Sequence, residues 1–243
     1  MGASPNKIDR DRLRSRSDTF FMNHQINLHT TVMGTALAVG GLALASLLGT
    51  ARLYQHNYLL LWFLWLASMI ACFDVYNSVF TSAIALPSIV PTPLDLLPPL
   101  LIGTSEFLLF GVLAHQATGL TRTSSVIEAW FFSFSAFCLC SLLGLWRADY
   151  VFESGIGSGA YDSEVEVAVK TVQKILRQDM WTVIGLAAAG FGVGLALALA
   201  TVPSFVLYIL ALAIIVALSA AARGHSKRAR TLARVIAVEP GAG

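Results

Sequence analysis

Charge is scarce in this chain. Asp, Glu, Lys and Arg together make up only 12% of the 243 residues, whereas hydrophobic residues make up 56% and the mean hydropathy is +0.70. A water-soluble domain typically carries about 25% charged residues. The composition therefore excludes an ordinary soluble domain and indicates a protein embedded in a membrane.

Cysteines and catalytic signatures are also few. The three cysteines, Cys72, Cys138 and Cys140, lie inside long apolar stretches, where no extracellular disulfide framework can form, so we expect buried thiols. The chain has no Gly-x-Ser-x-Gly elbow, no His-Glu-x-x-His, no phosphate loop and no dinucleotide fingerprint. We therefore favour a non-enzymatic role without cofactor or metal. The net charge of +2 does not indicate a nucleic-acid partner.

Six long apolar stretches are present, each reaching or approaching the roughly 20 residues that cross ~30 Å of hydrocarbon as a helix. They lie at residues 29–52, 58–85, 97–119, 125–146, 180–201 and 204–222. In hydrocarbon each backbone amide must be satisfied within its own segment, so these stretches predict helices rather than open strands. The expected fold is all-α and polytopic, with six transmembrane helices.

Lys and Arg fall almost entirely on one side of these spans. Both termini lie on that side because the number of spans is even. It carries 14 of the 16 basic residues, namely Lys7, Arg10, Arg12, Arg14, Arg16, Arg147, Lys170, Lys174, Arg177, Arg223, Lys227, Arg228, Arg230 and Arg234. Only Arg52 and Arg122 fall on the other side. The positive-inside tendency places both termini in the cytoplasm. We expect a multi-pass protein of the bacterial inner (plasma) membrane, with anionic lipid headgroups at its inner face.

Five parts follow from this topology. They are a basic arm (1–22), transmembrane helices one to four (23–146), a cytoplasmic segment (147–179), transmembrane helices five and six (180–222) and a basic tail (223–243). The arm is expected to be mobile or to lie at the membrane interface.

The cytoplasmic segment predicts an amphipathic helix. Ser163 and Glu166 have the spacing of a capping box, so the helix is expected to start there. Apolar residues recur at helical spacing opposite charged ones. The apolar face is Val165, Val169, Val172 and Leu176, and the charged face is Glu166, Lys170, Lys174 and Arg177. The apolar face is expected to lie on the inner leaflet or, alternatively, against a partner subunit.

Small residues at four-residue spacing mark the first and fifth spans. They are Gly41, Ala45, Gly49, Gly190, Gly194 and Ala198. This spacing lets helix backbones approach closely in lipid, so both faces are expected to pack on other helices. Packing within one chain and packing between chains leave the same pattern. A homo-oligomer and a complex with other membrane subunits therefore both stay open.

Two acidic residues lie inside the predicted spans. Asp74 and Glu106 fall on consecutive antiparallel helices, about 11 and 10 residues from their cytoplasmic ends, so both are predicted near the bilayer midplane, where they could face each other. Because no Lys or Arg lies in the interior of the spans, each acid must be protonated, share a proton or hold a cation. Asn77, Ser78 and Ser105 could line a polar path beside them. The alternative is that each acid is neutral and hydrogen-bonded within the bundle.

His115, Glu128 and Arg122 lie near the opposite ends of the third and fourth spans. They could form an outer gate, or Glu128 and Arg122 could simply be an ion pair at the membrane interface.

An acidic residue deep in a membrane is a functional hypothesis by default. The leading interpretation is a small transporter or channel for a proton, a cation or a small solute, with Asp74 and Glu106 as its ion-binding pair. The alternative is a non-catalytic structural or regulatory subunit of a larger membrane complex.

Overall fold

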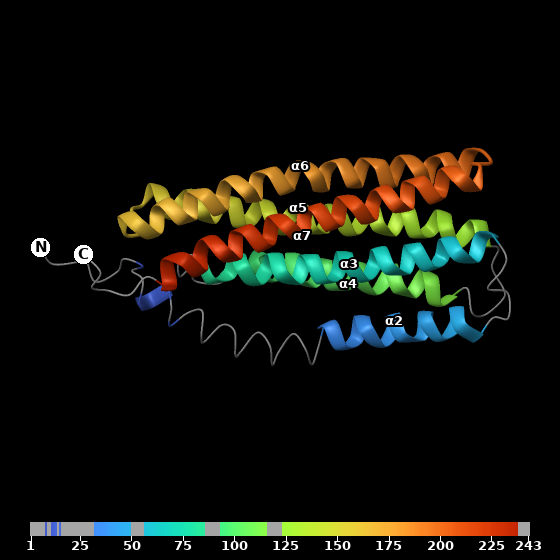
Figure 1. Ribbon diagram of the computed structural model, residues 1–243, viewed down its shortest axis with the longest axis horizontal. Coiled ribbons are helices and arrows are strands. Elements are labelled where there is room, and N and C mark those ends of the chain that lie inside the picture. Colours follow the sequence, from blue (N-terminus) through green and yellow to red (C-terminus); the bar gives the residue numbers. More distant parts are fainter. Residues whose placement is uncertain are drawn as a thin grey trace, which may run out of the picture.

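The computed structural model describes residues 8, 11–13, 15, 32–49, 56–85, 93–115 and 123–237. The helices run in the order α2 (Val32–Gly49), α3 (His56–Ala85), α4 (Pro93–His115), α5 (Thr123–Gly157), α6 (Ser163–Leu199) and α7 (Ser204–Ala237). They lie along one long axis, with α2 at one edge and α6 at the opposite edge (Figure 1). Apart from an isolated bridge between Ile8 and Tyr161, these residues form no β-structure. The prediction of an all-α fold is confirmed for this part of the chain.

Among the described residues, three helices are long and apolar enough to cross a membrane by length and composition. They are α5, α6 and α7, while α2, α3 and α4 contain the shorter apolar stretches Ala38–Leu48, Leu59–Val75 and Leu100–His115. A spanning helix needs about 20 predominantly apolar residues. The three long helices therefore indicate a membrane protein.

The long helices continue past the ends predicted from hydropathy. α6 joins the predicted amphipathic helix and the fifth span into one helix of 37 residues. α7 has 34 residues and includes most of the predicted basic tail, and α5 continues beyond residue 146 to Gly157. Residues 173–182 contain neither proline nor glycine, so nothing in the local sequence stops α6 where its hydropathy changes.

The turn between α5 and α6 depends on Gly159. This residue has φ of +66°, a conformation that glycine adopts without the steric cost of a side chain. α6 then begins at Ser163, as expected, but its N-cap is Asp162 and makes no side-chain capping hydrogen bond. The predicted capping box is therefore wrong. Glu166 instead forms an ion pair with Lys170 one turn along the helix, at 2.6 Å.

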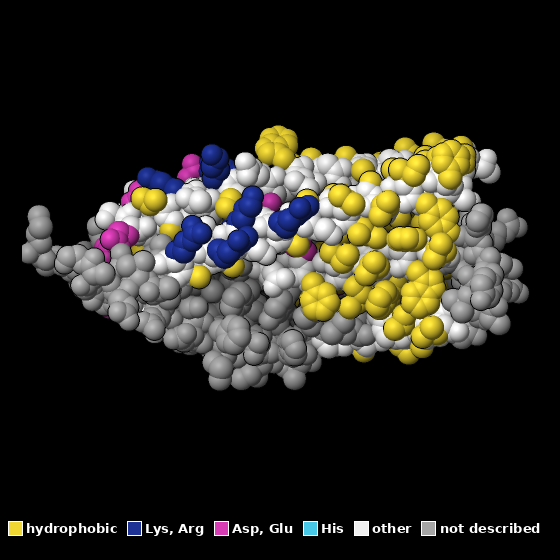
Figure 2. Space-filling view, viewed as in Figure 1, with side chains coloured by type: hydrophobic (Ala, Val, Ile, Leu, Met, Phe, Trp, Pro, Cys, Tyr) yellow, Lys and Arg dark blue, Asp and Glu magenta, His cyan; other side chains and the backbone are white. Residues whose placement is uncertain are grey.

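The two ends of the molecule's long axis differ in the side chains on their surfaces. Figure 2 shows hydrophobic side chains gathered toward the end where α6 meets α7, and Lys and Arg toward the end where α5 meets α6. In α5, α6 and α7 we call residues 123–146 and 180–222 the apolar half, and residues 147–179 and 223–237 the charged half. The boundary falls where the hydropathy of all three helices changes.

The charged half has a hydrophobic core of its own. Val165, Val169, Val172 and Leu176 are each 0% exposed. The three valines pack with Phe152 of α5 and Leu232 of α7. The apolar face of the predicted amphipathic helix is thus covered by this chain. The expectation that it lies on the leaflet or on a partner subunit is wrong.

Two described residues of the N-terminal segment join this core. Ile8 and Leu13 are buried. The backbone N–H of Ile8 donates to the carbonyl of Ala160 at 2.8 Å, and the N–H of Asp162 donates to the carbonyl of Ile8 at 3.2 Å. These residues therefore pack against the α5–α6 turn, in contrast to the mobile or interfacial arm predicted for 1–22.

Small residues bring α6 against α5 in the apolar half. A Cβ atom on Gly190 would lie 3.3 Å from the carbonyl oxygen of Phe131, and one on Gly194 would lie 3.0 Å from the ring of Phe132. The hydroxyl of Ser135 also donates to the carbonyl of Ala187 at 2.8 Å. Of the small residues predicted in the fifth span, Gly190 and Gly194 pack within the chain, whereas Ala198 is exposed.

In α2 the close approach is made by a neighbour of the predicted residues. A Cβ atom on Gly40 would lie 3.3 Å from the ring of Phe110, and the carbonyl of Gly40 accepts a hydrogen bond from Trp65 at 3.0 Å. Gly41 and Ala45 are exposed, and the surroundings of Gly49 lie outside what the structure describes. The buried side of α2 is therefore one position away from the face predicted for packing.

Candidate functional site: a buried ion cluster

The predicted polar residues of α3 and α4 lie inside the bundle, with one exception. Asp74, Ser78, Ser105 and Glu106 are buried, whereas Asn77 is exposed. The hydroxyl of Ser105 donates to the carbonyl of Ile102 within its own helix, at 2.7 Å. Ser105 therefore satisfies its own hydroxyl locally, and the buried acids are the chemically important groups.

Asp74 has a basic neighbour that the sequence analysis did not identify. Arg228 of α7 is 0% exposed, and its Nη2 lies 3.0 Å from Oδ2 of Asp179 on α6. The same nitrogen donates to Oγ of Ser78 on α3 at 3.2 Å. Asp74 lies within electrostatic reach of both Arg228 and Asp179. This ion cluster of Asp74, Ser78, Asp179 and Arg228 joins α3, α6 and α7.

Helix rise explains why these groups meet. At 1.5 Å per residue, Asp74 lies about 27 Å from the start of α3, and Asp179 about 30 Å from the end of α6. The Cα of Arg228 is about 36 Å from the start of α7, but helical side chains lean toward the N-terminus, which brings the guanidinium back toward the acids. The cluster therefore lies at the boundary of the two halves. The midplane position of Asp74 stays a prediction.

Helical phase could have revealed Arg228 and Asp179. Buried residues of α7 recur at alternating steps of four and three, and Arg228 continues that pattern. The pattern is Leu207, Ala211, Ile214 and Leu218, and further steps of three, four and three residues lead to Arg228, with Leu232 four residues later. Asp179 continues the buried face of Val165, Val169, Val172 and Leu176 in the same way. Sequence reasoning counted Arg228 only as one basic residue of a tail.

Gly224 lets α7 approach the Asp179 carboxylate. A Cβ atom at this position would lie 3.0 Å from Oδ1 of Asp179. Any side chain here would displace either the helix or the carboxylate that Arg228 holds. Glycine one turn before Arg228 therefore leaves room for the Asp179 carboxylate.

Glu106 has different surroundings from Asp74. Its carboxyl group lies within electrostatic reach of the Cys72 thiol. Cys72 packs with Phe110, against Val39 of α2. Cys72 and Asp74 are two positions apart on α3, so their side chains project about 160° apart around the helix axis. The two acids therefore have different neighbours, and their predicted face-to-face pairing stays a prediction.

The residues predicted as an outer gate are not brought together by any described contact between them. His115 is exposed at the end of α4, and Glu128 is partly buried in α5. Arg122 lies outside the described residues. The gate stays a prediction.

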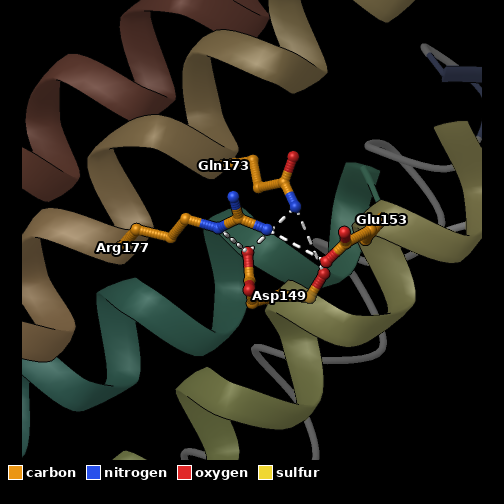
Figure 3. A network of polar contacts seen from close by, with 4 residues as sticks. All are labelled: Asp149, Glu153, Gln173 and Arg177. Carbon is orange, nitrogen blue, oxygen red and sulfur yellow. Dashed lines mark hydrogen bonds and ion pairs between the residues drawn. The ribbon is translucent and has the colours of Figure 1, made fainter.

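A second polar network joins α5 and α6 in the charged half (Figure 3). Nε of Arg177 donates to Oδ1 of Asp149 at 2.8 Å, and its Nη2 donates to Oε2 of Glu153 at 3.0 Å. Gln173 donates to the same Asp149 oxygen at 2.9 Å. The hydrogen bond to Asp149 raises the pKa of Arg177, which projects outside the apolar half. With Arg177 half-exposed, this network positions the helices more than it stabilises them.

Other chemistry-bearing residues are dispersed. Cys72 and Cys138 are buried, Cys140 is partly buried, and all three are free thiols. Within the described ranges, no three His, Cys, Asp or Glu side chains come together as metal ligands would. Comparison with known proteins finds no matching family model, no matching curated protein and no matching solved structure. The ion cluster and Glu106 are therefore the starting point for a functional proposal.

Proposed function

We propose that this chain is a small membrane transporter or channel that moves a proton, a cation or a small solute through its helical bundle. The observation that carries the proposal is the burial of Asp74 and Arg228 against Asp179, at the boundary between the apolar and charged halves. Ionisable side chains are costly inside a membrane protein, and those retained there usually mark ion pathways or proton relays. Glu106 is a second buried carboxyl group that such a pathway could use.

The proposed topology has six spans, α2 to α7, with both termini in the cytoplasm. The long α5, α6 and α7 would cross the membrane through their apolar halves, and the shorter apolar stretches of α2, α3 and α4 would line the same bundle. The concentration of Lys and Arg at one end supports this orientation under the positive-inside tendency. A multi-pass protein of the bacterial inner membrane would have this arrangement.

The ion cluster suggests how binding and helix movement could be coupled. Arg228 supplies positive charge to carboxyl groups from two different helices. A proton or cation arriving at Asp74 would compete with the guanidinium for the same negative charge, because both are opposite charges in a poorly solvated site. Weakening the hold on Arg228 would free α7 to shift relative to α3 and α6. In this proposal Asp74 binds the moving ion, and the contact of Arg228 with the acids couples ion binding to a shift of α7.

Ion flux into proteoliposomes tests the proposal. The purified full chain is reconstituted, and uptake of protons, Na⁺ and K⁺ is followed for the wild type and for Asp74→Asn, Glu106→Gln and Arg228→Gln. Glu164→Gln is the control, because it makes the same acid-to-amide change on an exposed residue of the charged half. We expect Asp74→Asn and Arg228→Gln to reduce flux at least about tenfold and Glu164→Gln to leave it unchanged. Flux that is absent from the wild type would contradict transport, and flux that is equal in all variants would contradict the role of Asp74 and Arg228 in it.

A membrane-complex subunit is the second candidate, favoured by one observation. Gly41 on α2 is exposed, and a Cβ atom added to it would have no other atom within 4 Å. A helix of another subunit could approach there as α5 approaches Gly190. Purification in mild detergent followed by mass spectrometry tests this candidate. A stoichiometric second protein would support it, and a chain that purifies alone would oppose it.

A further inference from the structure

One face of α7 in the charged half is lined with basic side chains. Arg223, Lys227, Arg230 and Arg234 are all exposed, and their spacing of four, three and four residues puts them on the same side of the helix. We call these four residues the basic stripe. In Figure 2 the Lys and Arg side chains of this half begin directly beside the hydrophobic surface. α7 contains no Asp or Glu, so its own sequence offers no neutralising charge.

Two of the three basic residues of α6 differ in this respect. Lys170 pairs with Glu166, and Arg177 pairs with Asp149 and Glu153. For the basic stripe, the structure records no ion pair among the residues it describes. The stripe therefore presents net positive charge, whereas the neighbouring surface of α6 has mixed charge.

The position of the stripe points to the membrane surface. The apolar part of α7, residues 204–222, rises about 28 Å, which matches the ~30 Å hydrocarbon thickness of a bilayer. Arg223 follows immediately. Helical side chains lean toward the N-terminus of their helix, which for α7 is toward the apolar half. Nε of Arg230 follows this rule, since it donates to the carbonyl of Ser226, one turn closer to the apolar half, at 3.1 Å.

We propose that the basic stripe is a contact surface for anionic phospholipid headgroups. Headgroups occupy a layer about 5–7 Å thick on each side of the hydrocarbon, and the stripe starts at its edge and leans into it. Lys and Arg near an anionic leaflet strengthen binding about fivefold each. An acidic protein surface would also suit the charge, but it would not require the stripe to begin at the apolar boundary. The inference needs the apolar half to lie in a bilayer and does not depend on transport.

Tryptophan quenching by brominated lipids tests the proposal on the full chain. Trp146 and Trp181 lie at the boundary and are 61% and 75% exposed, so bromine on nearby acyl chains can reach them. The protein is reconstituted in phosphatidylcholine bilayers containing either brominated phosphatidylglycerol or brominated phosphatidylcholine. For the wild type we expect stronger quenching by the anionic lipid at equal mole fraction, with the excess falling as salt is added.

Two double variants with equal charge change locate the effect. Lys227→Gln with Arg230→Gln neutralises the centre of the stripe, and Lys170→Gln with Lys174→Gln makes the same change on α6. We expect the stripe variant to lose about fivefold in relative affinity for phosphatidylglycerol per residue. We expect the α6 variant to lose less than about twofold, because Lys170 is already paired with Glu166. All four side chains are exposed, so neither variant disturbs the core.

Two results would overturn the proposal. Equal quenching of the wild type by both lipids would show that the stripe does not select anionic headgroups, and would leave an acidic protein surface as its partner. Equal losses in the two double variants would show that overall charge, not the stripe, attracts the lipid. Neither result would bear on ion flux.

Discussion

The apolar and charged halves of the molecule both have hydrophobic cores but differ in their surfaces. In the apolar half, Phe191 and Leu199 are 54% and 78% exposed, while in the charged half Val169 and Phe152 are 0% exposed and Lys170 is exposed. The same helices, α5 to α7, pass through both halves. Large apolar side chains gather on the surface of the apolar half and charged ones on the surface of the charged half, because hydrocarbon and water favour opposite surfaces. The difference indicates that each half is built for a different solvent.

The ion cluster lies where the two patterns meet. Asp179 and Arg228 occupy buried positions of α6 and α7 just on the charged side of the boundary. At that level the helices are surrounded partly by hydrocarbon and partly by water. A buried charge pair is therefore less costly there than it would be farther into the apolar half. The cluster consequently connects the two halves as well as three helices. The following predictions test this contrast, from the largest expected effect to the smallest.

Removing the guanidinium should have the largest effect. Arg228→Met leaves the Asp179 carboxyl buried without its ion pair, and breaking a buried pair in this way costs about 3–5 kcal/mol of unfolding free energy. Lys227→Met is the matched control, because Lys227 is the exposed neighbour and such changes usually cost under about 0.5 kcal/mol. Thermal unfolding of the full chain in detergent, followed by tryptophan fluorescence, measures both. Equal stability of the two variants would place Arg228 in solvent.

A double variant distinguishes the cost of an unpaired buried charge from the cost of lost packing around Arg228. Asp179→Leu combined with Arg228→Met removes both charges, and apolar replacement of a buried pair is often close to neutral. The double variant should therefore recover most of the stability that Arg228→Met loses. A double variant as unstable as the single one would mean that the cost came from lost packing around the arginine.

Truncating the core of the charged half should have the next largest effect. Val172→Ala removes a side chain that is 0% exposed and should cost about 2 kcal/mol from lost burial and the cavity left behind. Val167→Ala makes the same change on the same helix, but Val167 is 67% exposed, so its cost should be near zero. The same unfolding assay applies. If both variants matched the wild type, the apolar face of this segment would not be packed inside the chain.

Adding one methyl group to α6 tests its approach to α5. A Cβ atom on Gly190 would press on Phe131 and Phe134, whereas one on Gly192 would meet nothing within 4 Å. Gly190→Ala should therefore be less stable than Gly192→Ala by about 1–2 kcal/mol, since overpacking opposes the helix propensity that alanine adds. A Gly190→Ala variant at least as stable as Gly192→Ala would contradict close packing of the two helices.

The α5–α6 polar network should have the smallest effect. Arg177 is 51% exposed, so Arg177→Gln should cost less than about 1 kcal/mol, and the cost should shrink as salt is added. Lys174→Gln, one turn earlier on α6, is the control. A large loss of stability that does not depend on salt would show instead that this network is shielded from water and holds the fold together.

Hydropathy predicted the helical fold and the positions of the apolar segments, because both depend on local composition. It did not predict where α5, α6 and α7 end. A change in hydropathy marks a change of surroundings, and a helix satisfies its backbone equally well in lipid and in water. The amphipathic pattern of Val165, Val169 and Val172 was recognised, but a sequence alone does not say which surface covers an apolar face.

The candidate site was predicted only in part. Asp74 and Glu106 stand out in an apolar stretch, and both are buried. Their partners depend on the relative rotation and depth of helices far apart in sequence, as the contact between Ser78 and Arg228 illustrates. Arg228 was also hidden among other basic residues of a helix whose remaining charges are exposed. Only the continuation of the buried phase of α7 distinguishes it.

Spin-label accessibility along α6 tests the contrast between the halves most directly. A nitroxide is attached at Phe191→Cys in the apolar half or at Val167→Cys in the charged half, after Cys72, Cys138 and Cys140 have been replaced by alanine. Both positions are exposed, so the label reports the solvent around it in a reconstituted bilayer. We predict that the label at 191 collides mainly with oxygen, which concentrates in hydrocarbon, and the label at 167 mainly with a water-soluble nickel chelate. Equal access of the nickel chelate to both positions would contradict the account, because α6 would then lie in one solvent along its whole length.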